Sequence, residues 1–171
     1  MVLLAACALM AAGCAPSPPG PAVLTSLHYA SSGCGLTEAY TVSLADDGRA
    51  HVVLAHGAWK DWGTSPAMET LDGYADGSVL ADLGGIIQDT RFTQWDGANV
   101  CVAWGPYNVP FTITFTYNDH TYTVKGNKGQ CGQAEPTRFV PAYQSLVDEL
   151  RHLVARLPGY DALQVPWVGC T

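Results

Sequence analysis

The strictest pattern in the sequence is the alternation of apolar residues with threonine over residues 111–117. A period of two places successive side chains on opposite faces of a strand, so one face is apolar and the other carries hydroxyl groups. After the turn residues 118–120, the segment 121–124 repeats the pattern, with Tyr122 and Val124 extending the apolar face. The sequence therefore predicts a β-hairpin within an antiparallel sheet that buries one face.

Further strands are predicted before this hairpin. The segments with strand character are 23–30, 40–44, 50–56 and 100–103. The residues Asp46-Asp47-Gly48 offer the chemistry of a tight turn between the second and third of these strands. Residues 57–77 mix aromatic and turn residues without a clear period, so no element is predicted there.

Two helices complete the predicted fold. Apolar residues at helical spacing predict one helix that begins after Asp76-Gly77-Ser78, and an amphipathic stripe predicts a second over residues 138–157. The expected order is β-β-β-α-β-β-β-α. This order predicts an α+β fold, a mostly antiparallel sheet with two helices packed on one face, formed by a single domain over residues 23–171.

The N-terminal residues resemble an export signal. An apolar run over residues 2–12 is too short to span a bilayer and is typical of a signal peptide. It ends in Ala11-Ala12-Gly13-Cys14, which resembles the lipobox of bacterial lipoproteins, where small residues precede a cysteine that is lipidated and becomes the new N-terminus. The resemblance implies a signal peptide over residues 1–13 and lipidation at Cys14. A similar motif ends at Cys7, which remains the alternative.

A proline-rich spacer follows this motif. Residues 15–22 contain four prolines and no charge, and the first charged side chain in the chain is Glu38. In the polyproline conformation, at ~3.1 Å per residue, such a segment extends roughly 25 Å. We expect residues 14–22 to be a tether that holds the domain away from a membrane, with the lipid as the anchor. The predicted location is the bacterial cell envelope.

The cysteine count fits an exported protein. Without residues 1–13 the chain has five cysteines, and lipidation of Cys14 leaves an even number. The remaining four are Cys34, Cys101, Cys131 and Cys170. In an oxidising compartment this parity predicts two disulfide bonds, for which three pairings exist. Because Cys101 and Cys131 flank the predicted hairpin, we expect them to pair, which leaves Cys34 with Cys170.

The sequence contains no recognisable catalytic motif, so we predict neither an enzyme, a cofactor nor a metal site. His51 and His56 are five residues apart on a predicted strand and therefore point to opposite faces, which favours surface histidines over a chelating pair. His28 is predicted to be an isolated polar residue. The net charge of −7, without clustered Lys and Arg, argues against nucleic acid as a partner.

Aromatic residues in predicted loops are the strongest candidates for a binding surface. They are Trp59, Trp62, Trp104 and Tyr107, each close to small or polar residues. Such side chains can stack on sugars or anchor a protein partner, and they can equally cap the edge of a small core.

The whole chain resembles a family of small bacterial lipoproteins of unknown function. The matching segments are Ser32-Gly33-Cys34-Gly35, Tyr40-Thr41-Val42, Asp47-Gly48 and the segment around Phe92. The resemblance implies the topology given above and carries over no catalytic residue. We therefore expect a lipid-anchored, non-enzymatic envelope protein that binds a protein or has a structural role. The alternatives are a module that binds glycan or cell wall through the loop aromatics, and an inhibitor of a secreted hydrolase.

Overall fold

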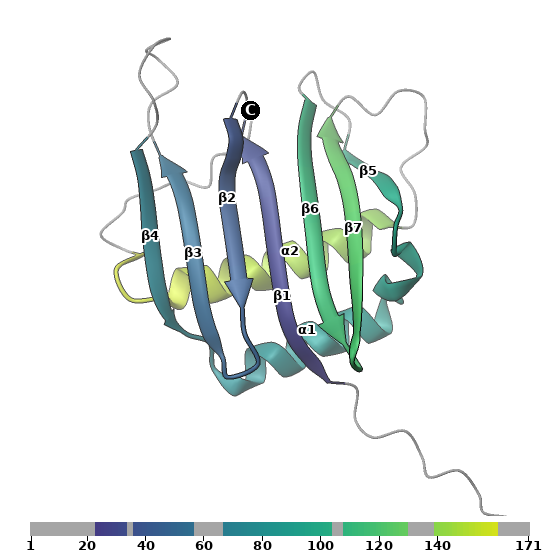
Figure 1. The fold of residues 1–171 in the computed structure, drawn as a ribbon, viewed down its shortest axis with the longest axis horizontal. Coiled ribbons are helices and arrows are strands. Elements are labelled where there is room, and N and C mark those ends of the chain that lie inside the picture. The colour runs from purple at the N-terminus through teal and green to yellow at the C-terminus, as the bar shows by residue number, and fades with distance from the viewer. Residues whose placement is uncertain (1–22, 34–35, 57–66, 104–107, 130–138, 161–171) are drawn as a thin grey trace, which may run out of the picture.

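A computed structural model of the chain describes residues 23–33, 36–56, 67–103, 108–129 and 139–160. Seven strands form one sheet in the order β4-β3-β2-β1-β6-β7-β5 (Figure 1). Their bounds are β1 Leu24–Gly33, β2 Leu36–Leu44, β3 Arg49–His56, β4 Ala67–Tyr74, β5 Asn99–Ala103, β6 Asn108–Tyr117 and β7 His120–Gly129. All neighbouring strands are antiparallel except β5 and β7, which are parallel. The predicted α+β class is confirmed.

Two helices lie on the same side of this sheet. The helices are α1 (Gly77–Asp89) and α2 (Phe139–Arg156), and a short 3-10 helix, η1 (Phe92–Trp95), follows α1. In Figure 1 both helices pass behind the strands, and α2 runs across them. The predicted packing of two helices on one face is therefore confirmed. Within the described part of the chain, no helix has the length and apolar character needed to cross a bilayer.

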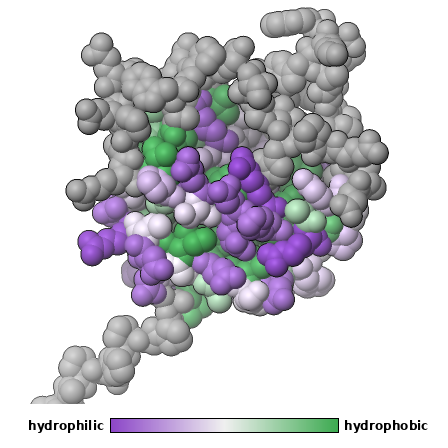
Figure 2. Space-filling model, turned by 180° about the vertical axis from the view of Figure 1, so that it is seen from behind, coloured by the Kyte–Doolittle hydropathy of each residue, from purple (hydrophilic) through white to green (hydrophobic). Residues whose placement is uncertain are grey.

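The core lies between the helices and the apolar face of the sheet. Among its largest fully buried side chains are Tyr29, Phe92, Phe115, Leu83 and Leu146. Seen from behind, the helix layer presents mainly hydrophilic side chains with small apolar patches between them (Figure 2). On the opposite face of the sheet, the described residues form no helix (Figure 1). One face is therefore packed and the other is open, as the Thr alternation predicts.

The hairpin between β6 and β7 has a two-residue turn. Asn118 and Asp119 both adopt positive φ, 49° and 63°. This conformation defines a type I′ turn, whose twist matches that of the flanking strands and which favours Asn and Asp. The turn pairs Tyr117 with His120 and so fixes the register of the hairpin. The turn at Asp46-Asp47-Gly48 is also confirmed, with Gly48 at φ 82°.

The prediction missed one strand, β4, within the region that shows no clear period. Only Leu71 on its inner face is a large buried apolar residue, so the apolar alternation is too weak to identify a strand. The inner position Gly73 lacks a side chain for a packing reason. A Cβ there would lie 2.9 Å from Leu157 Cδ2 and 3.2 Å from Pro158 Cδ, just after α2. Leu157 and Pro158 therefore leave no room for a side chain at Gly73, and β4 lacks a second apolar residue that would complete the alternation.

Candidate functional site

The strand register aligns polar side chains across the open face of the sheet. Residues directly opposite one another on successive strands form a continuous row from β4 to β7. The row is Asp72, His51, Ser43, His28, Thr114 and Thr123. Because each pair is a direct cross-strand neighbour, the side chains lie within reach of one another. We call this set the polar row.

Three side-chain hydrogen bonds hold parts of the polar row together. His51 Nδ1 donates to Asp72 Oδ1 at 2.6 Å, which fixes the orientation of the imidazole. His28 Nδ1 and Ser43 Oγ are 2.9 Å apart. The Thr114 and Thr123 hydroxyls are 3.4 Å apart. His28 is therefore not the isolated polar residue that the sequence predicts, because its contact with β2 depends on a pairing that local spacing does not reveal.

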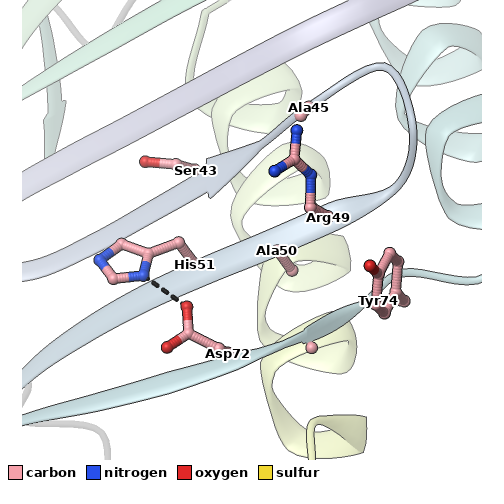
Figure 3. A pocket seen from close by; sticks show the side chains of 8 residues that line it. Ser43, Ala45, Arg49, Ala50, His51, Asp72 and Tyr74 are labelled. Atoms are coloured by element: carbon pink, nitrogen blue, oxygen red, sulfur yellow. Dashed lines mark hydrogen bonds and ion pairs between the residues drawn. The ribbon is translucent and has the colours of Figure 1, made fainter.

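One end of the polar row lines a shallow depression over β2, β3 and β4, with a volume of about 450 Å³. Figure 3 shows Arg49, His51, Asp72 and Tyr74 around this depression, on the open face of the strands. The lining residues are Ser43, Ala45, Arg49, Ala50, His51, Asp72, Gly73 and Tyr74. Small side chains at Ser43 and Ala45 leave room between the longer ones on β3 and β4. We call this depression the β2–β4 pocket.

Two cross-strand pairs form the wall of the β2–β4 pocket. Arg49 lies opposite Tyr74, and His51 lies opposite Asp72. Both pairs stand on the open face, since Ala50 between Arg49 and His51 is buried in the core. The Tyr74 side chain is 74% exposed, which makes it the most exposed of the large hydrophobic residues in the described ranges.

The turn before β3 neutralises Arg49. Arg49 Nε donates to Asp47 Oδ2 at 2.6 Å, and the Arg49 backbone N–H donates to Asp47 Oδ1 at 3.0 Å. The backbone hydrogen bond is the main reason that the pKa of Asp47 lies below its usual value, and the guanidinium lowers it further. The carboxylate is therefore ionised at neutral pH and opposes the arginine charge at the rim of the pocket.

The geometry favours binding over nucleophilic catalysis. In a Ser-His-Asp arrangement, the histidine that contacts the carboxylate also takes the proton of the serine. Here His51 contacts Asp72, whereas the Ser43 hydroxyl is hydrogen-bonded to the other histidine, His28. Ser43 also lies in a central strand paired on both sides, so its backbone N–H belongs to the sheet ladder and is not available to an oxyanion.

The candidate residues from the sequence mostly lie elsewhere. Four aromatics, Trp59, Trp62, Trp104 and Tyr107, lie outside the described residues. So do the predicted lipid site at Cys14 and the cysteines Cys34, Cys131 and Cys170. Cys101, on β5, is disulfide-bonded, and its pairing with Cys131 stays a prediction. Over the described ranges, no group of three or more His, Cys, Asp or Glu side chains is placed to hold a metal ion.

A second polar cluster lies on the helix side, inside the fold. The Tyr29 and Tyr143 hydroxyls are 2.9 Å apart, and Lys128 Nζ lies 5.7 Å and 6.0 Å from the two ring centres. Lys128 also donates to Ser31 Oγ at 2.9 Å. Burial is the main cause that raises the pKa of Tyr143 well above its usual value, with the neighbouring Tyr29 adding to the shift. These contacts join β1, β7 and α2, which indicates a structural role.

No protein-family model matches the chain, and no curated protein matches it.

Proposed function

We propose that the protein is a lipid-anchored lipoprotein of the bacterial cell envelope that acts by binding, and that the open face of its sheet is the binding surface. The single observation that carries this proposal is the polar row. It extends across six strands, on the face that neither described helix covers, and its side chains are oriented by hydrogen bonds to one another. Groups that are already held in place lose little conformational entropy when a ligand binds.

The anchor rests on the order of the N-terminal segments. A lipobox-like motif ends at Cys14, a proline-rich spacer follows, and β1 begins at Leu24. A thioether-linked lipid with a further acyl chain supplies more than the two signals that stable membrane attachment requires. The extended spacer would keep the domain clear of the lipid headgroups, with its open face accessible to envelope components.

The disulfide bonds belong to the same proposal. We propose that Cys101 pairs with Cys131 and Cys34 with Cys170, as expected in an oxidising compartment. A bridge from Cys101 would brace β5, an edge strand of only five residues that pairs with a single neighbour. Peptide mapping without reduction would identify the pairs, and a Cys101–Cys34 or Cys101–Cys170 peptide would contradict this pairing.

Two experiments test the anchor and the surface separately. Intact mass of the membrane fraction should show an acylated N-terminus at Cys14, and Cys14→Ser should release the protein in soluble form. An unmodified N-terminus, or acylation at Cys7, would contradict the assignment of Cys14.

For the surface, a photo-crosslinking amino acid is placed at Thr114, in the middle of the polar row, or at Gln144, an exposed position on α2. We expect adducts in intact cells from position 114 and none from position 144. Equal yields from the two positions would refute the open face as the binding surface.

A further inference from the structure

Resting on the binding function proposed above, we infer that the β2–β4 pocket binds a segment of a linear, uncharged glycan, with the Tyr74 ring as its stacking platform. The side chains that would select this ligand belong to β2, β3 and β4.

The first argument is the placement of Tyr74. A tyrosine ring offers a flat apolar surface that suits the C–H face of a sugar, and its hydroxyl remains in water. Tyr74 is 74% exposed at the edge of the pocket and is not part of the hydrophobic core. In Figure 3 the ring stands on β4, across from Arg49 of β3. An apolar platform is thus placed directly next to hydrogen-bonding groups.

The second argument is the set of polar groups around that ring. Asp72 supplies an acceptor pair, Arg49 a planar fork of donors, and Ser43 a hydroxyl that both donates and accepts. Vicinal hydroxyls of a sugar ring need donors and acceptors side by side. Carboxylate and guanidinium groups meet this need, because each can engage two neighbouring hydroxyls at once.

The third argument is the balance of charge, which separates a glycan from an anion. Arg49 contacts Asp47 at 2.6 Å, and His51 contacts Asp72 at 2.6 Å. The guanidinium and the imidazole of the pocket therefore each face a carboxylate. A phosphate or a nucleic acid would have to displace these carboxylates and approach a chain of net charge −7. A neutral, hydroxyl-rich ligand can instead bind without breaking either pair.

The shape favours a polymer over a small enclosed ligand. A volume of about 450 Å³ is within the usual size of ligand pockets, yet this one is shallow and open to solvent. Beyond Ser43 the polar row continues through His28 to Thr114 and Thr123, on the face opposite α1 and α2. A linear chain could therefore lie across the strands, with one ring on Tyr74 and the next residues over the hydroxyls of the row.

Binding is tested with the full-length lipoprotein in a detergent that carries no sugar headgroup. Isothermal titration calorimetry measures the dissociation constant for linear hexamers of N-acetylglucosamine and of glucose, and for inorganic phosphate. We expect at least one glycan to bind and phosphate not to bind. Because the ligand carries no charge, the constant should change less than about twofold on raising the salt concentration to several hundred millimolar.

Variants then locate the site. Tyr74→Ala should weaken glycan binding about tenfold, whereas Tyr74→Phe should retain it, since the ring provides the stacking. Arg49→Ala and Asp72→Asn should also weaken binding. Met68→Ala is the matched control, because Met68 is 53% exposed on the same face of β4 but does not line the pocket. Wild-type affinity in Tyr74→Ala, or equal losses in Tyr74→Ala and Met68→Ala, would overturn the inference.

The remaining outcomes separate this inference from the proposed function. If no glycan binds, while position 114 still crosslinks to an envelope protein, the glycan inference fails and the binding function stands. If glycan binds but Cys14 carries no lipid, the anchor fails and the inference stands. Mass spectrometry of the titrated hexamers should show them intact, and cleavage would contradict binding without catalysis.

Discussion

A substitution at Gly126 tests how β5 is held at the edge of the sheet. Gly126 lies in β7, opposite Phe111 of β6 on one side and Val100 of β5 on the other. A Cβ at this position would lie 2.6 Å from Phe111 Cε1 and 2.6 Å from the Val100 carbonyl oxygen. The ring can shift, but the carbonyl belongs to a paired backbone. A methyl group at Gly126 therefore requires β5 and β7 to move apart.

Gly126→Ala should therefore lower the free energy of unfolding by about 3 kcal/mol, the upper part of the usual range for overpacking. Such a loss is a large share of the total stability of a domain of this size. The assay is equilibrium urea unfolding with the disulfide bonds intact, followed by far-UV circular dichroism. Phe111→Leu combined with Gly126→Ala should be less destabilised than the sum of the single variants by ~1 kcal/mol, because the smaller side chain relieves part of the clash.

Gly85→Ala is the matched control for this prediction. Gly85 lies in α1, and a Cβ there would meet nothing within 4 Å. The change should raise the free energy of unfolding by roughly 0.5–1 kcal/mol, since alanine is the better helix former and restricts the unfolded chain. If the Gly126 and Gly85 variants unfold within about 0.5 kcal/mol of each other, the packing argument at β7 is refuted.

Three further predictions concern pH, helix capping and the surface ion pair. Burial raises the pKa of Tyr40 and Tyr143, so above about pH 10 only the unfolded chain releases these two protons. The free energy of unfolding should therefore fall as the pH rises above about 10, by up to ~1.4 kcal/mol per pH unit for each tyrosine. Titration of all eight tyrosines together near pH 10, before unfolding, would contradict this. Asp76→Ala removes the side chain that accepts the Ser78 N–H at the start of α1 and should lower the unfolding free energy by ~1 kcal/mol in urea, whereas an unchanged midpoint would argue against a cap. Asp72→Asn should lower it by less than ~1 kcal/mol, because the pair with a 52% exposed imidazole is screened by solvent, and a larger loss in the same assay would show a structural role.

The parts of the fold that the sequence predicts are those fixed by local pattern. The alternation over 111–124 and its Asn-Asp turn define β6 and β7, because a two-residue turn sets the register of both strands. The apolar stripe of α2 is equally local. In contrast, β4 escapes detection because Leu157 and Pro158, just after α2, leave no room for a side chain at Gly73 on its inner face.

The candidate site escapes detection for a different reason. Asp72, His51, Ser43 and His28 are separated by irregular intervals along the chain, and each carries an ordinary polar side chain for an exposed strand position. They become neighbours only through the pairing of β4 with β3, β3 with β2 and β2 with β1. A shift of one residue in any of these pairings would turn one of them toward the core. The row is therefore a property of register, which only the complete sheet specifies.

Folding and solubility explain some of the side chains on the open face of the sheet and leave others unexplained. Two helices cover one face of the sheet, so the other must be compatible with water, and the threonines of β6 and β7 meet this need while retaining a high strand propensity. Solubility alone does not explain an exposed tyrosine beside an arginine, or a histidine held by a carboxylate at 2.6 Å. If Asp72→Asn and Tyr74→Ala leave stability nearly unchanged but weaken binding as expected, the residues of the β2–β4 pocket are explained by recognition and not by the fold.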